Sequence, residues 1–275
     1  MALFSISGFL IILNILFSYR GFKDSFFFNK YAFHIDPVII QKDYKRVITS
    51  GFLHVNWTHL IFNMFSLYIF SGSLESFIGP FNYVIIYVAG LVGGNLLSLL
   101  IHRHHADYTS VGASGAIFAV MFSAIAIFPG MQIGLFFLPS IPGWLFGLAY
   151  VLFSIYGIKS RTNNIGHDAH LGGGVAGMLV AILLYPSMLI DNAFTILIVA
   201  VPAIAFILFI LYKPEALLID NYFFKNHHYL TVEDKYNLRQ RNKQQDLDKL
   251  LEKIHQRGMD SLSRKEKEQL KEYSK

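Results

Sequence analysis

The residues from Val111 to Phe128 read VGASGAIFAVMFSAIAIF, a run of 18 residues without a charged side chain. A helix that crosses the hydrocarbon core of a bilayer needs about 20 mostly apolar residues. Similar runs lie on both sides of this one, so the sequence predicts seven membrane spans. They are Ala2–Tyr19, His59–Ile78, Phe81–Ile101, Val111–Phe128, Ile141–Ile158, Ala169–Leu189 and Ala193–Leu211.

The composition agrees with a membrane protein. The 275 residues are 54% hydrophobic and 15% charged, whereas a soluble domain has about 25% charged residues. Only 7 of the 18 acidic and 9 of the 23 basic residues precede Tyr212. The chain has no cysteine, which excludes disulfides, thiolate metal ligands and a cysteine nucleophile. We expect an all-α polytopic membrane protein that ends in a soluble, charged tail.

This pattern divides the chain into a six-span core in residues 1–190, an additional span in residues 191–213 and a charged helical tail in residues 214–275. The spacing of Leu247, Leu250, Leu251 and Ile254 predicts an amphipathic helix, and a capping box at Ser263–Glu266 predicts a second one. We therefore expect a soluble C-terminal helical hairpin. Basic and acidic residues alternate along the tail, which is typical of a solvated helix surface and excludes nucleic acid as the expected partner.

Strongly polar residues inside apolar spans are costly, so each is a candidate functional residue. Ser114 lies between glycines in Gly112-Ala113-Ser114-Gly115, at the start of the fourth span. A serine at a helix N-terminus is exposed next to free backbone N–H groups, as a nucleophile with an oxyanion hole requires. Small residues that let two helices pack closely are the alternative interpretation of this motif.

A histidine at the start of the sixth span is the candidate partner of this serine. His170 is followed by Gly173, Gly177 and Ala181, a stripe of small residues that allows close approach of a neighbouring helix. If that neighbour is the fourth span, the imidazole of His170 lies within hydrogen-bonding reach of Ser114 and can act as a general base. A structural histidine that bonds a carbonyl across helices is the alternative.

Two further polar residues, His59 and Asn63, share one face of the second span because they are four residues apart. Both can donate hydrogen bonds to a developing oxyanion, although polar contact between helices is an alternative role. Glu75, at the other end of this span, is expected to be a structural hydrogen-bond acceptor. Phe118, one turn after Ser114, offers a flat apolar face to the imidazole.

A third catalytic group is not evident. Asp168 is two residues from His170, so on a helix the two side chains point about 200° apart. A Ser–His dyad is therefore the simpler interpretation. A metal-dependent enzyme would have to use His102, His104, His105, Asp107, His167 and His170, but the cluster from His102 to His105 has no helical ligand spacing. We expect no metal and no cofactor.

Together these motifs resemble the rhomboid family of intramembrane serine proteases, over about Arg46 to Leu183. The resemblance covers His59 and Asn63, then Gly112 to Gly115, then His170 with Gly173 and Gly177. It implies that Ser114 is the nucleophile, that His170 is the general base, and that Asn63, His59 and the Ser114 backbone N–H bind the oxyanion. Phe118 stands at the family's aromatic position below the histidine, and Glu75 at an acidic position that supports the first loop. Lys45 stands where the family usually has tryptophan.

The resemblance implies a six-helix core with one added C-terminal span that cleaves transmembrane segments of other membrane proteins. The lipid bilayer and transmembrane substrates are the expected partners, the tail partner is unknown, and the expected location is a bacterial inner or plasma membrane. A catalytically inactive rhomboid relative that binds or escorts membrane clients is the alternative. Such relatives typically lack the serine or the histidine, and both are present here.

The orientation in the membrane has two conflicting indications. All nine basic residues before the tail lie in the first, third and fifth loops, six of them between Arg20 and Arg46. The positive-inside rule places these loops and the tail in the cytoplasm. The resemblance implies the reverse, since rhomboid sites usually open away from the cytoplasm. The first loop, Arg20–Thr58, is long, aromatic and expected to lie in the membrane interface, where the rule is weak. We favour the family orientation.

Overall fold

The computed structural model of the chain describes residues 5–103, 105, 108–134, 139–160, 165–213, 253–254 and 263. The chain divides into two units, Met1–Asp220 and Asn221–Lys275. The predicted hairpin of the tail lies outside the described residues, apart from Lys253 and Ile254, which are helical. The proposed division at residues 190 and 213 remains a prediction.

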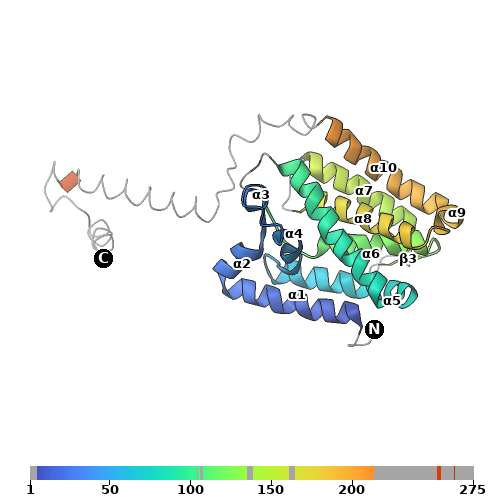
Figure 1. The fold of residues 1–275 in the computed structure, drawn as a ribbon, viewed down its shortest axis with the longest axis horizontal. Helices are drawn as coiled ribbons and strands as arrows, with labels where there is room; N and C mark the ends of the chain where they lie inside the picture. The colour runs from blue at the N-terminus through green and yellow to red at the C-terminus, as the bar shows by residue number, and fades with distance from the viewer. Residues whose placement is uncertain are drawn as a thin grey trace. The chain divides into compact units, whose positions relative to one another are not determined.

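The first unit is a bundle of apolar helices (Figure 1). Its long helices are α1 (Ile6–Lys23), α5 (Trp57–His102), α6 (Ser114–Ile127), α7 (Gly143–Ser160), α8 (His167–Leu184) and α10 (Ala193–Tyr212). Five of them, all except α6, are long and apolar enough to cross a membrane. The prediction of an all-α polytopic membrane protein is confirmed.

Helix α5 provides two of the predicted spans. Its 46 residues would extend about 69 Å if straight, more than twice the thickness of a bilayer core. The backbone breaks at Gly79, where φ is 78° and helical geometry is lost. Pro80 follows, and because proline has no N–H it is suited to the first turn of the second half. This break lies between the predicted spans His59–Ile78 and Phe81–Ile101.

Two predicted ends differ from the structure by four residues or more. The first span was expected to end at Tyr19, but α1 continues to Lys23, with Arg20 and Lys23 in its last turn, where cations complement the helix dipole. The sixth was expected to end at Leu189, but α8 ends at Leu184. Tyr185 precedes Pro186, and a residue before proline is disfavoured in the helical conformation.

Short elements gather at the two ends of the bundle. The first loop contains α2 (Ser25–Tyr31), β1 (Phe33–His34), α3 (Ile35–Ile39), α4 (Arg46–Thr49) and η1 (Ser50–Phe52). Strand β1 pairs antiparallel with β2 (Thr109–Ser110). The other elements are β3 (Gln132–Ile133), paired with β4 (Ile141–Pro142), and α9 (Met188–Asp191). Figure 1 shows α2, α3 and α4 at one end of the bundle and α9 and β3 at the other.

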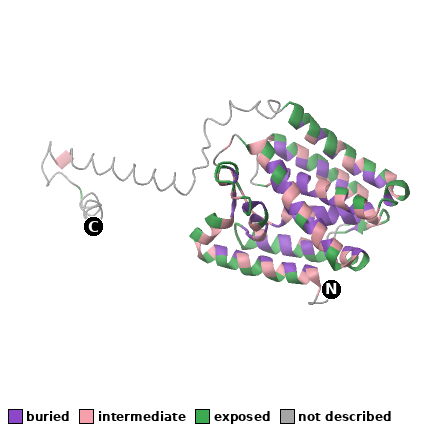
Figure 2. Ribbon diagram, viewed as in Figure 1, coloured by how far each residue is buried: buried purple, intermediate pink, exposed green. Residues whose placement is uncertain are grey.

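The buried residues concentrate on α6 and α8, whereas α1 and α10 show exposed residues along their outer faces (Figure 2). Eleven of the 14 residues of α6 are buried. Of the 18 residues of α8, 61% are buried, against 28% of the 18 residues of α1. The exposed apolar side chains of the outer helices are suited to lipid contact, and the two inner helices carry Ser114 and His170.

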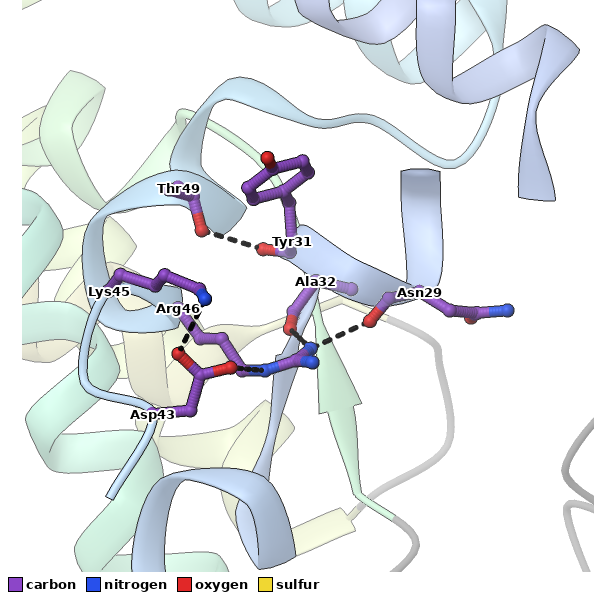
Figure 3. A network of polar contacts seen from close by, with 7 residues as sticks. All are labelled: Asn29, Tyr31, Ala32, Asp43, Lys45, Arg46 and Thr49. Carbon is purple, nitrogen blue, oxygen red and sulfur yellow. Dashed lines mark hydrogen bonds and ion pairs between the residues drawn. The ribbon is translucent and has the colours of Figure 1, made fainter. Parts of the chain in front are cut away.

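The first loop is folded around the guanidinium of Arg46 (Figure 3). Its Nη1 donates to the carbonyl oxygens of Asn29 at 2.6 Å and Ala32 at 2.7 Å, and its Nε donates to Asp43 at 2.9 Å. Lys45, at the position where the family usually has tryptophan, pairs with the same carboxylate at 3.3 Å. Arg46 therefore fixes the loop through a network that needs no tryptophan.

Candidate active site

Ser114 and His170 lie together in the bundle. Ser114 is the first residue of α6, and His170 belongs to the first turn of α8, where its backbone N–H donates to the Gly166 carbonyl. The His170 Nε2 lies 2.7 Å from the Ser114 Oγ. His170 is 8% exposed, whereas Ser114 is half-buried. The pair therefore has the geometry for proton transfer, with the hydroxyl on its more accessible side.

The two helices approach closely because glycines face each other across them. A Cβ built at Gly173 would lie 2.2 Å from the Gly115 carbonyl oxygen, and one at Gly177 would lie 2.4 Å from the Ala119 Cα. Either distance is too short for any side chain larger than hydrogen. The small-residue stripe of α8 thus packs on α6, which is the condition under which the sequence brought His170 within reach of Ser114. This packing sets the distance between the serine and the histidine.

The imidazole of His170 has a partner on each ring nitrogen. Tyr150 of α7 places its hydroxyl 2.7 Å from Nδ1. When the Ser114 hydroxyl donates to Nε2, Nδ1 carries the proton and donates to the Tyr150 oxygen. The Phe118 ring lies 4.6 Å from the imidazole and stacks on the Tyr150 ring at 4.0 Å. Phe118 therefore lies against the histidine, as the sequence suggested.

Sequence reasoning missed Tyr150, which is one of 15 tyrosines. Its span, Ile141–Ile158, contains no histidine, asparagine or acidic residue that would single it out. The available signal was weaker: a tyrosine hydroxyl in the middle of an apolar span requires a hydrogen-bond partner.

His59 lies next to the loop that leads into α6. Gly112 has a φ of 130°, which favours glycine, and a Cβ at this position would lie 2.9 Å from the His59 Cε1 and 3.8 Å from the Ser114 Oγ. The absence of a side chain at Gly112 therefore lets the His59 ring approach the serine. The prediction that His59 lies at the site agrees with this position, and its role remains a proposal.

Asn63 is less directly placed. Its side-chain amide donates to the His59 carbonyl at 2.9 Å, one turn earlier on α5. Its Oδ1 is buried and has no hydrogen-bond partner among the described residues. The hydrogen bonds of the described residues do not join Asn63 to Ser114, and its role as an oxyanion donor remains a proposal.

The first loop holds the residues before Ser114 in position. The Gly112 N–H donates to the Ser50 carbonyl at 3.0 Å, and β1 pairs with β2 just before Gly112. His54 is fully buried, with its Nδ1 2.8 Å from the Ser18 hydroxyl and its ring 4.9 Å from that of His59. Burial, and secondly the nearby His59, lower the pKa of His54 to about 3. His54 is therefore neutral at physiological pH.

Glu75 has a structural role at the opposite end of the bundle. Its carboxylate accepts hydrogen bonds from the backbone N–H groups of Ile6 at 2.7 Å and Ser7 at 3.1 Å, and also from the Ser7 hydroxyl. These donors begin α1, where a carboxylate satisfies free N–H groups. Glu75 thus anchors the start of α1, and its contacts are not with the first loop as the resemblance implied.

The histidines considered as metal ligands do not form a metal-binding group among the described residues. No cluster there of three or more His, Asp or Glu side chains has suitable geometry. His104 and Asp107 lie outside the described residues. His102 instead faces Asp168, with its Nε2 3.3 Å from the carboxylate.

The fold and this site define a polytopic helical membrane protein with a serine–histidine pair between two central helices. The Rhomboid domain matches residues 41–187, more than half of the chain, so the chain belongs to the rhomboid family. Residues 230–275 match a family of unknown function, DUF6576.

Curated relatives come from several compartments. The chain is 35% identical to rhomboid protein 1, mitochondrial, of Saccharomyces cerevisiae, over 52% of this chain and 43% of the relative. It is 32% identical to Rhomboid-like protein 11, chloroplastic, of Arabidopsis thaliana, over 64% of this chain and 62% of the relative. With rhomboid protease GluP of Bacillus subtilis it shares 26% identity, over 53% of this chain and 27% of the relative.

The chain thus spans about half the length of the curated relatives it matches. The family assignment and the apolar helices both indicate that the chain crosses a membrane several times. The expectation of a bacterial plasma membrane gains no support from the relatives, because two of the three above have organellar names.

Proposed function

We propose that this chain is an intramembrane serine endopeptidase that cleaves transmembrane segments of other membrane proteins. The observation that carries the proposal is the 2.7 Å hydrogen bond between the Ser114 Oγ and the His170 Nε2, formed between two buried helices. The family assignment and a relative named as a rhomboid protease support it.

In the proposed reaction the Ser114 Oγ attacks the carbonyl carbon of the scissile peptide bond. His170 takes the hydroxyl proton on Nε2, and the Tyr150 oxygen accepts from Nδ1, which keeps the ring oriented. The imidazolium then donates its proton to the leaving amine. Water, activated by the same imidazole, attacks the acyl enzyme and releases the new carboxyl end.

The oxyanion has three candidate donors. The first intrahelical hydrogen bond of α6 runs from the Ile117 N–H to the Ala113 carbonyl, so the N–H groups of the preceding first turn point out of the helix N-terminus. The Ser114 N–H belongs to this turn. His59 lies beside Gly112, and Asn63 follows one turn later on the same face of α5. Such preorganised donors stabilise the charge that develops on the carbonyl oxygen.

The depth of the site fits a substrate inside the membrane. Helix α6 has 14 residues and extends about 21 Å, less than the roughly 30 Å thickness of a bilayer core. At least one end of α6 therefore lies below a membrane surface. An intact substrate helix hides its carbonyl groups in its own hydrogen bonds, so the segment must unwind locally before attack. We expect substrates with helix-weakening residues near one membrane face.

Cleavage of defined peptides tests this proposal. The purified chain and its Ser114→Ala variant are placed in lipid vesicles with a panel of transmembrane peptides that differ in helix-weakening residues. We expect the parent to cleave a subset and the variant to cleave none, with equal yield and membrane insertion. Persistent cleavage by the variant would exclude Ser114 as the nucleophile. Binding of the peptides by both proteins without cleavage would favour the inactive, client-binding alternative.

A further inference from the structure

A second polar cluster lies beside the Ser–His pair and has no part in the proposed reaction. It consists of Asp168 in the first turn of α8, His102 at the end of α5 and Tyr108 in the loop between α5 and β2. Asp168 is 5% exposed and is the only buried carboxylate in the part of the chain that the structure describes. A buried carboxylate is costly unless it is paired and hydrogen-bonded, so its partners require an explanation.

The contacts of this carboxylate are specific. The Tyr108 hydroxyl donates to Asp168 Oδ2 at 3.1 Å, and the His102 Nε2 lies 3.3 Å from the same oxygen. The rings of His102 and Tyr108 stack, with centroids 3.7 Å apart and planes 10° apart. Burial, and then the charge of Asp168, raise the pKa of Tyr108 well above its usual value, which keeps the phenol protonated as a donor.

The cluster joins the segments that carry the catalytic pair. Asp168 is two residues before His170, and Tyr108 is six residues before Ser114. Because side chains two residues apart on a helix point about 200° apart, the first turn of α8 presents His170 to Ser114 and Asp168 to α5. The turn is thus held from two sides, by the serine and Tyr150 on one and by the cluster on the other.

The N-cap of α8, Gly166, supplies no side-chain hydrogen bond to fix this turn. On the apolar side, the Ala169 carbonyl oxygen packs against Gly94 and Gly115. A Cβ built at Gly94 would lie 2.6 Å from this oxygen, and one built at Gly115 would lie 3.3 Å from it. These contacts limit how closely the helices approach, but they provide no directional bond that fixes the rotation of α8 about its axis. Asp168 provides such a bond.

We infer that Asp168 is a positioning residue, whose pairing with His102 and Tyr108 fixes the first turn of α8 and thereby the orientation of His170 toward Ser114. The inference rests on the proposed function, since it assigns Asp168 to the same site. It differs from a triad because Asp168 contacts the end of α5 and the loop that follows it rather than the imidazole. The expected consequence of its loss is a slower chemical step with unchanged substrate binding.

The test uses the purified full chain in lipid vesicles, with a cleavable transmembrane peptide and a fluorophosphonate that labels reactive serines. For Asp168→Asn we expect kcat and the labelling rate to fall by about tenfold, the effect of one lost charge-assisted hydrogen bond, while KM changes less than twofold. His102→Gln keeps an N–H donor toward Asp168 and should retain more activity than His102→Leu. If His102 acted through packing alone, both His102 variants would lose kcat and labelling rate to the same extent.

Glu75→Gln is the matched control, because it makes the same carboxylate-to-amide change at the start of α1. This site is 16 residues beyond His59 on α5, about 24 Å along the helix. We expect Glu75→Gln to lower thermal stability while kcat and labelling stay at the parent level. Equal losses in both carboxylate variants, or parent-level kcat in Asp168→Asn, would overturn the inference. A parent chain that neither cleaves nor labels would instead contradict the proposed function itself.

Discussion

At the scale of the residue, the imidazole of His170 is fixed by three neighbours. Ser114 and Tyr150 bond its two nitrogens, each at 2.7 Å, and Phe118 covers its face. The ring therefore has one orientation, in which Nε2 faces the serine. A general base must be held in this way before it can accept a proton efficiently.

Tyr150→Phe tests the hydrogen bond to Nδ1. The substitution removes the hydroxyl but keeps the ring that stacks on Phe118 at 4.0 Å. A neutral hydrogen bond contributes about 0.5–1.5 kcal/mol, so kcat should fall by roughly 2- to 12-fold with little change in KM. Steady-state cleavage of a transmembrane peptide measures both constants. An unchanged kcat would show that Phe118 and Ser114 orient the ring without Tyr150.

The polar residues of the site could be predicted to different degrees. Ser114, His170, His59 and Asn63 stand out because each is a polar side chain in an apolar run, close to glycines or in helical register. Tyr150 could not be distinguished, because a tyrosine is compatible with both the core and the interface of a membrane protein. The partners of Asp168 also depend on how α5 ends and α8 begins, which spacing alone does not specify.

At the scale of the element, the packing of α6 on α8 depends on glycines, whose side chain is a single hydrogen atom. Gly173 faces the Gly115 carbonyl, and Gly177 faces Ala119. Any side chain at these positions forces the two helices apart. The distance between Ser114 and His170 is therefore a property of the glycines as much as of the two catalytic candidates.

Gly173→Ala tests this packing. Its Cβ would lie 2.2 Å from the Gly115 oxygen, so we expect a destabilisation of about 1–3 kcal/mol and, because a shift of about 1 Å can cost a hundredfold in rate, a loss of cleavage of that order. Gly72→Ala on α5 is the control, since a Cβ there meets nothing within 4 Å. Thermal unfolding in detergent and cleavage assays measure both effects. Equal activity of the two variants would contradict the packing argument.

The first loop should lose stability in acid because of His54. The folded loop holds the pKa of His54 at about 3, whereas the unfolded loop has the ordinary value of about 6.5. Above pH 6.5 the stabilisation is fully present. As the pH falls below 6.5, the unfolded loop binds a proton that the folded loop excludes, so the free energy of unfolding falls by about 1.4 kcal/mol per pH unit.

Hydrogen exchange of the first loop between pH 8 and pH 5 measures this slope. His34 contributes to the loss of stability in acid in the same direction as His54, because burial and then Arg46 lower the pKa of His34. His54→Gln should therefore be less stable at pH 8 but show a smaller slope. A variant with the slope of the parent would show that His54 is not the titrating group.

The helices were easier to predict than the connections. Apolar length and the Gly79-Pro80 pair were sufficient to separate the spans, and Pro186 explains the early end of α8. The short helices of the first loop were not predicted, because they are held by Arg46 bonds to carbonyl groups that are remote in sequence. Such long-range backbone contacts leave no periodic pattern.

At the scale of the whole molecule, the open question is the orientation in the membrane, and it concerns the contacts that the basic residues make. Arg46 is buried in its loop network, and Arg20, Lys23 and Lys30 lie over aromatic rings at 4.3–5.5 Å. Arg20 and Lys23 end α1, and Lys30 and Arg46 belong to the folded first loop. All four still lie near the ends of membrane spans, where the positive-inside rule counts them. The charge pattern and the family orientation therefore still oppose each other, and a topology reporter decides between them.

A reporter fused after Lys275 tests the orientation. We expect a reporter that is active only outside the cytoplasm to be active at this position. Six predicted spans separate the first loop from the tail, so both lie on the same side of the membrane, which is outside the cytoplasm in the family orientation. The same reporter in the loop after Ile127 should be inactive. The opposite pattern would contradict the family orientation and agree with the positive-inside rule.

The proposed protease activity requires His170 to make Ser114 nucleophilic. Exposing the purified chain to a fluorophosphonate and mapping the modified residue by mass spectrometry tests this directly. We predict labelling of Ser114 alone, with the rate lowered by a factor of about 10² to 10⁴ in His170→Ala. No labelling of Ser114, or the same labelling rate after the loss of His170, would contradict the account.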